Sequence, residues 1–132
     1  MKGICRGAIL HRMFETTIPP KPKFFVVIGE SETHIIGYFF INSNINNYIR
    51  RETDVYNLQM PCKRSEYPFL SYDSFIAAHE LNVLDKSLLS EELTSGKTSI
   101  KGCLNTEDMT RLIEAAKTSD LFSPYEKDTY FK

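Results

Sequence analysis

Four cations and three tyrosines alternate between residues 48 and 67, and such side chains bind single-stranded nucleic acid. The cations are Arg50, Arg51, Lys63 and Arg64, and the tyrosines are Tyr48, Tyr56 and Tyr67. Cationic side chains bind phosphates with an affinity that falls as salt rises, and aromatic rings stack on bases. The segment therefore predicts a surface that binds single-stranded nucleic acid. A solvated loop whose tyrosines close a core is the alternative interpretation, and both stay open at this point.

His79 is the side chain best suited to proton transfer, because an unperturbed imidazole has a pKa of about 6.5. It lies in a segment, Ser74 to Val83, in which odd-numbered apolar residues alternate with polar ones. We consider His79 as a catalytic base or acid near a cleft. A core histidine with one satisfied nitrogen is the alternative.

Two short motifs resemble known signatures but are incomplete. Gly96-Lys97-Thr98 matches the end of a phosphate-binding loop, yet Glu91 stands where that loop needs its first glycine. His79-Glu80 matches the start of a zinc-protease signature, but Val83 stands where the second histidine is needed. We therefore expect neither a nucleotide-binding loop nor a metal site of this type.

Composition places the chain among single-domain proteins. Its 132 residues are enough to bury a core, and the net charge of −1 indicates no global attraction to nucleic acid. The three cysteines, Cys5, Cys62 and Cys103, are widely spaced and support neither a disulfide framework nor a zinc site. No apolar stretch approaches membrane-spanning length. We expect a cytoplasmic protein with no membrane segment and no cofactor.

Two apolar runs, Lys23–Ile28 and His34–Ile41, are the centre of the predicted fold. Both are short and rich in Phe, Val and Ile, which is typical of strands. Successive residues are apolar, so both faces must be covered. In so short a chain, a sheet rolled into a small barrel would cover them, with Gly37 at a bend. The expected fold is therefore mainly β with α, as one domain.

The other elements follow from local patterns. The first is a strand at Gly7–Phe14, followed by a proline-rich loop at residues 15–22. An irregular insert is expected at about 45–68, with a weak strand at Val55–Met60. After it come one bent strand or a strand pair at Ser74–Val83, an ambiguous segment at Asp85–Leu93, and a last strand at Thr98–Leu104. Asn105 is a good N-cap, and it predicts a C-terminal helix from about residue 106. We expect Pro124 to limit any further turn, and the tail Tyr125–Lys132 is either docked or loose.

Three stretches carry a resemblance to a known family. They are Arg6-Gly7-Ala8-Ile9-Leu10, the strand Lys23–Ile28, and Lys101-Gly102-Cys103-Leu104 followed by the capped helix. Together they resemble the MazF/PemK (Kid-like) toxins of type II toxin–antitoxin systems. The resemblance implies an SH3-like small barrel with a C-terminal helix, the MazF/CcdB-like fold.

The resemblance also implies an activity and a site. Many members of the family are metal-independent endoribonucleases that cleave single-stranded RNA, and a cognate antitoxin peptide and a homodimer belong to the same expectation. Carried over by position, Lys23 stands for the family's catalytic arginine, Ser43 for its threonine and Asp73 for its aspartate. With His79, these residues form the expected catalytic set.

A second class of function stays open beside the enzyme. Lys23-Phe24 replaces the family's Arg-Pro pair, and a lysine is a point charge where arginine is a planar, two-pronged donor. That departure favours a non-catalytic SH3-like barrel that binds a protein partner, as an inactive toxin relative or as an interaction module of a defence or mobile-element locus. Inhibition of a topoisomerase, as in the CcdB branch, is not separable by sequence.

Overall fold

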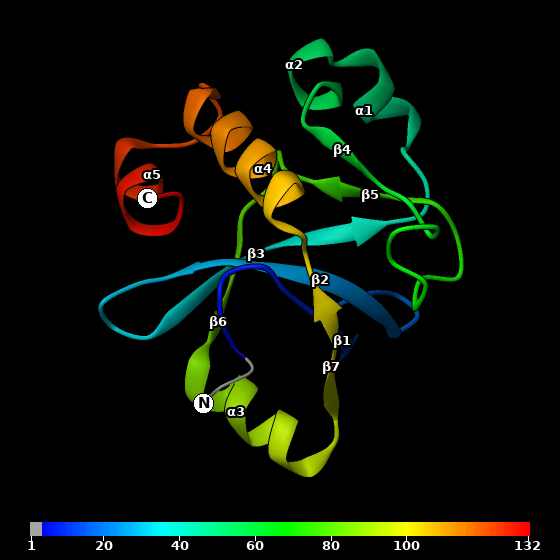
Figure 1. Cartoon of the computed structure of the whole chain (residues 1–132), viewed down its shortest axis with the longest axis vertical. Helices are drawn as coiled ribbons and strands as arrows, with labels where there is room; N and C mark the ends of the chain where they lie inside the picture. Colours follow the sequence, from blue (N-terminus) through cyan, green and yellow to red (C-terminus); the bar gives the residue numbers. More distant parts are fainter. Residues whose placement is uncertain (1–3) are drawn as a thin grey trace.

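The computed structural model describes residues 4–132, which form a seven-stranded antiparallel sheet with helices on both sides (Figure 1). The strands are β1 (Ala8–Phe14), β2 (Lys21–Glu30), β3 (Ile35–Asn42), β4 (Gln59–Cys62), β5 (Ser74–Ala77), β6 (Asn82–Asp85) and β7 (Thr98–Cys103). The helices are α1 (Asn47–Arg51), α2 (Thr53–Tyr56), α3 (Lys86–Ser95), α4 (Thr106–Thr118) and α5 (Pro124–Tyr130). The fold is therefore mixed, as the sequence predicted.

Successive residues of β2 enter two different cores, because side chains alternate across a strand. Val26 packs in a cluster with residues of α4 and with Phe131, which follows α5, whereas Val27 packs in a second cluster with Leu89 of α3. Figure 1 shows α4 and α5 on one side of β2 and β3, and α3 on the other. Helices α4 and α5 thus cover one face, whereas the core on the other face is made mostly of residues from β1, β2 and β3, with Leu89 of α3.

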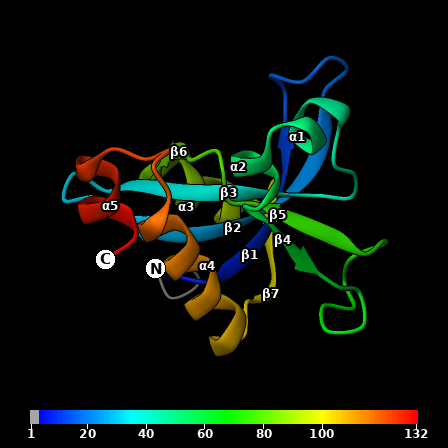
Figure 2. The ribbon, with the colours of Figure 1, turned by 90° about the horizontal axis from the view of Figure 1, so that it is seen from above.

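The sheet is strongly curved, and its pairing path has two ends. The strand order is β4-β5-β3-β2-β1-β7, and β6 also pairs with β3. β6 pairs with the first half of β3 and β5 with its last two residues, so both lie along one side of that strand. Figure 2 shows β4 and β5 turning away from the direction of β2 and β3. No strand pairing in the described chain joins β4 to β7, so hydrogen bonds do not close the sheet.

The segment from 45 to 68 is more regular than predicted. It holds α1, α2 and β4, and the weak strand expected at residues 55–60 begins only at Gln59. Asn46 caps α1, because its side-chain oxygen accepts a hydrogen bond from the backbone of Ile49 at 2.9 Å. β4 contains Pro61 and pairs only with β5, which makes it an edge strand. The expectation of an irregular insert was therefore wrong for most of this segment.

The alternation expected from Ser74 to Val83 holds in only part of the segment. Two strands pair with β3, as predicted for a strand pair, but Ser74 and Ile76 are buried and Val83 is 56% exposed. The buried face of β5 carries Ile76 because it packs in the core beneath α4. The prediction that the odd positions share the buried face was wrong for this reason.

The C-terminal half matches the predicted helix and adds another. Asn105 caps α4, as expected, and its side chain accepts a hydrogen bond from the Asp108 backbone at 2.8 Å. Pro124 does not end a helix but begins α5, where a missing N–H costs nothing. The tail is docked, since Phe131 is fully buried.

Gly37 has a different purpose from the bend we expected. A Cβ at this position would lie 2.6 Å from the Cδ1 atom of Tyr130, so only glycine lets that ring lie against β3. Gly29, the partner of Gly37 in the sheet, is equally close to the Tyr130 backbone. This pair of glycines lets α5 dock.

None of the helices in residues 4–132 is both long and apolar enough to span a bilayer.

Candidate functional site

A groove lies where β2 begins and β3 ends, and its volume is about 530 Å³. The chain after β3 and the loop before β5 form its walls. Its lining residues are Lys21, Pro22, Lys23, Phe24, Ile41, Asn42, Ser43, Asn44, Asn46, Ile49, Leu70, Ser71, Tyr72 and Ser74.

The lining combines amides, hydroxyls, an aromatic ring and positive charge. Asn42, Asn44 and Asn46 supply both donors and acceptors. Tyr72 is 69% exposed and offers a ring face to solvent, and Lys21 is exposed at the rim. None of the described residues that line the groove is a carboxylate or a histidine. The groove is therefore suited to a polar, anionic chain with planar groups.

Lys23 and Ser43, two of the four predicted catalytic residues, both line this groove. The Lys23 ammonium, however, lies 4.2 Å from the centroid of Phe40. Phe40 packs against the core on the α3 side, whereas Phe24, the next residue of β2, packs against the opposite core. Burial and the neighbouring Lys21 charge lower the pKa of Lys23. Its charge thus rests on the sheet face away from Phe24.

Asp73 does not line the groove, although its neighbour Tyr72 does. Its Oδ1 atom accepts a hydrogen bond of 2.9 Å from the backbone N–H of Arg64. That bond ties the loop after β4 to the start of β5. Asp73 therefore has a structural role of the kind that aspartates play in turns.

His79 lies outside the groove as well. Its Nδ1 atom is 2.7 Å from the side-chain nitrogen of Gln59, which also donates to the Val55 carbonyl at 3.0 Å. Because that amide nitrogen donates, Nδ1 accepts, and burial lowers the pKa of the ring. His79 is half-buried. The geometry matches the satisfied core histidine that we kept as the alternative.

The predicted RNA-contacting residues separate into two groups. Tyr48, Arg50 and Arg51 are exposed on α1, directly after groove residue Asn46. Lys63 and Arg64 are exposed in the loop that follows β4.

Tyr67 does not belong with them, because it is only 4% exposed and its hydroxyl donates to Asp108 at 2.7 Å. Burial and this hydrogen bond raise the pKa of Tyr67. The expectation that Tyr67 contacts RNA is incompatible with this placement, since the ring helps close the core.

Sequence reasoning missed several residues of the groove. Lys21 and Pro22 were assigned to a loop, yet they pair with Phe14 and Met13 as part of β2. The asparagines at and just after the end of β3 were not among the predicted site residues. Three amides within five residues, at 42, 44 and 46, were the signal that could have indicated a polar binding surface.

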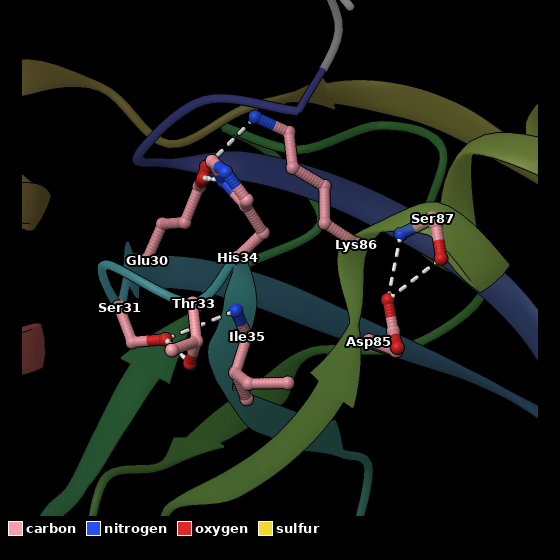
Figure 3. Close-up of polar contacts among 8 residues, drawn as sticks. All are labelled: Glu30, Ser31, Thr33, His34, Ile35, Asp85, Lys86 and Ser87. Carbon is pink, nitrogen blue, oxygen red and sulfur yellow. Dashed lines mark hydrogen bonds and ion pairs between the residues drawn. The ribbon is translucent and has the colours of Figure 1, made fainter.

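A second polar cluster joins the β2–β3 turn to α3 (Figure 3). Glu30 lies between His34, at 2.8 Å, and the Lys86 ammonium, at 2.9 Å. These hydrogen bonds, with that of His34 the larger cause, lower the pKa of Glu30. His34 has a φ of 63°, a left-handed conformation that the turn imposes. Glu30 is engaged by both neighbours, and the Asp85 carboxylate accepts hydrogen bonds from Ser87, so we assign the cluster to the fold.

Across residues 4–132 there is no group of three or more His, Cys, Asp or Glu side chains arranged to bind an ion.

No protein-family model matches the chain, and no curated protein shows significant similarity to it.

Proposed function

We propose that this protein is a MazF/PemK-like toxin with an SH3-like barrel, which binds single-stranded RNA in the groove and cleaves it without a metal. The order of elements supports the proposal: three strands come first, and the last strand leads directly into a capped helix, with α1, α2 and α3 placed among the strands between them. A homodimer and a cognate antitoxin peptide belong to the same proposal.

The composition of the groove is the single observation that carries RNA binding. Amide groups can hydrogen-bond to base edges, Tyr72 can stack on a base, and Lys21 can pair with a phosphate. Tyr48, Arg50 and Arg51 continue this surface along α1. Since single strands expose both bases and phosphates, they fit such a lining better than a duplex does.

Cleavage would proceed by attack of a ribose 2′-hydroxyl on the neighbouring phosphate. The 2′-oxygen gives up its proton to a solvent water and bonds to phosphorus, which gives a 2′,3′-cyclic phosphate. The P–O bond to the 5′-oxygen breaks, and that oxygen takes up a proton from solvent, because the described lining holds no carboxylate or histidine. Lys21 lies at the groove to stabilise charge on the phosphate, and the Ser43 hydroxyl can donate to it. Lys23 would join them once its flexible stem lifts the ammonium off Phe40.

The test is to incubate the purified protein with a mixed-sequence, end-labelled RNA in excess EDTA. We expect fragments with cyclic-phosphate or 3′-phosphate ends, and their yield should fall for Lys21→Ala and Tyr72→Ala. His79→Gln, which lies outside the groove, is the matched control and should cleave as the unmodified protein does. RNA that stays intact at high protein concentration would exclude catalysis.

One observation favours a non-catalytic barrel as the second candidate. Asp73 and His79 are engaged in hydrogen bonds away from the groove, which leaves its described lining without a residue that acts as a base near neutral pH. The groove would then bind an extended chain without cleaving it. Recovery of a small acidic partner in a pull-down, with intact RNA in the assay above, would support this candidate.

A further inference from the structure

Three aromatic side chains from separate parts of the chain lie in a row beside the groove. His11 of β1 has its ring centroid 4.5 Å from that of Phe24 of β2. The Phe24 centroid is in turn 5.7 Å from that of Phe69, which lies in the loop before β5. All three side chains are partly exposed. We call this set the aromatic row.

The aromatic row is continuous with the groove. Phe24 belongs to both, and Leu70, the neighbour of Phe69, also lines the groove. His11 and Phe24 are direct partners in the β1–β2 register, so they lie side by side on one sheet face. A chain that leaves the groove over Phe24 therefore meets His11 next.

The strand on the far side of β1 is shaped for the same row. Gly102 of β7 leaves room for Phe69, because a Cβ there would lie 2.9 Å from the Cε2 atom of that ring. The adjacent Lys101 is exposed, and its charge is close enough to His11 to lower the pKa of that imidazole, beside the larger effect of burial. An aromatic surface with a cation at its edge results.

His11 also differs from the other two histidines. The Nδ1 atoms of His34 and His79 are hydrogen-bonded to Glu30 and Gln59. In the described chain, the His11 ring instead packs against the Phe24 ring. A neutral imidazole of this kind can stack and can still donate and accept one hydrogen bond each.

We propose that His11, Phe24 and Phe69 form a stacking subsite for one RNA base beyond the groove, with Lys101 beside the phosphate of that nucleotide. The inference rests on the proposed function, because it extends the RNA path from the groove across β2 to β1 and β7. Aromatic stacking is tolerant of base identity, so the subsite contributes affinity and length dependence rather than sequence preference.

The experiment measures binding of fluorescently labelled RNA of two to eight nucleotides, made uncleavable by 2′-O-methyl groups, by fluorescence anisotropy. In the unmodified protein, affinity should rise by about 5- to 100-fold at the length that first reaches the subsite. His11→Ala should remove that step and leave the affinity for shorter RNA unchanged. His11→Phe should restore it, and Lys101→Ala should lower the salt dependence only for the longer RNA.

The outcomes separate this inference from the function on which it rests. If Tyr72→Ala weakens RNA binding while His11→Ala leaves the length series unchanged, the subsite is wrong and the groove stands. If the unmodified protein binds no RNA of any length, both are wrong. Circular dichroism and thermal unfolding of each variant show whether it is folded, so that a missing rise in affinity is not mistaken for unfolding.

Discussion

The hydroxyl of Tyr67 donates a hydrogen bond of 2.7 Å to Oδ2 of Asp108, and both side chains are buried. The same hydroxyl accepts a hydrogen bond of 3.1 Å from the backbone N–H of Asn105. It thereby joins the loop before β5 to the first turn of α4. A buried carboxylate needs such partners, because an unsatisfied charge in the interior costs several kcal/mol.

Tyr67→Phe should lower the free energy of unfolding by about 1–3 kcal/mol, because it removes a buried hydrogen bond to a charged group. Urea unfolding followed by circular dichroism measures the change. Tyr72→Phe, on an exposed ring, is the control and should leave stability within about 0.5 kcal/mol. A Tyr67→Phe protein as stable as the parent would contradict the role we assign to this bond.

Gly37→Ala should destabilise the protein by about 1–3 kcal/mol, because the new methyl group collides with the Tyr130 ring. The test is a double-mutant cycle with Tyr130→Ala in chemical denaturation. Once the ring is absent, the alanine at 37 should cost much less than it does beside the tyrosine. Equal costs in both backgrounds would mean that Gly37 is needed for its backbone and not for the ring.

Glu92→Gln should change how stability depends on pH. The carboxylate accepts hydrogen bonds from Arg12 at 2.6 Å and from Thr98 at 2.8 Å, and the Arg12 bond is the main reason that its pKa is lowered. A carboxyl with a lower pKa in the folded state adds stability above its unfolded pKa of about 4.5 and loses it as pH falls through the folded pKa.

We expect Glu92→Gln to cost about 1–3 kcal/mol from pH 6 to 8, with the difference from the parent shrinking below about pH 4.5. Thermal unfolding across this pH range measures it. Glu91→Gln, at the exposed neighbouring position, should show little difference at any pH. A Glu92→Gln deficit that persists unchanged at low pH would show that shape and not charge is responsible.

Lys21→Ala should weaken RNA binding and reduce its salt dependence. Loss of one phosphate contact to a single strand lowers the slope of log affinity against log salt by about 0.7. Anisotropy titrations between low and moderate salt give the slope. Lys117→Ala, at an exposed position of α4, is the control with the same change of charge. If the slope for Lys21→Ala equals that of the unmodified protein, Lys21 does not contact a phosphate.

Local patterns predicted much of the fold. The strands at β1, β2, β3 and β7 and the Asn105-capped helix follow from short apolar runs and one capping residue. The need for glycine at position 37 depends on a contact with Tyr130, 93 positions away, which local patterns do not contain. The start of α5 was missed although its signal is local, because Ser123 and Glu126 form a capping box around Pro124. Tertiary packing therefore determines features of the fold that the spacing of apolar residues does not predict.

The site was less accessible to sequence reasoning than the fold. Lys23 and Ser43 do reach the groove, whereas Asp73 and His79 are held by Arg64 and Gln59. Residue type indicates which chemistry a side chain can do, but its neighbours decide whether that chemistry is available. The ring of Tyr67 is the clearest case, since stacking on RNA and closing a core need the same residue type.

Pro61 in β4 has a consequence for how copies of the chain meet. A proline in an edge strand has no backbone N–H on the open side, so an incoming strand finds no hydrogen-bond donor at that position. End-to-end joining of sheets, the first step towards fibres, therefore finds a poor template at β4. Strands of two molecules that join would therefore do so along β7 or β6, each of which is paired on one side only within residues 4–132.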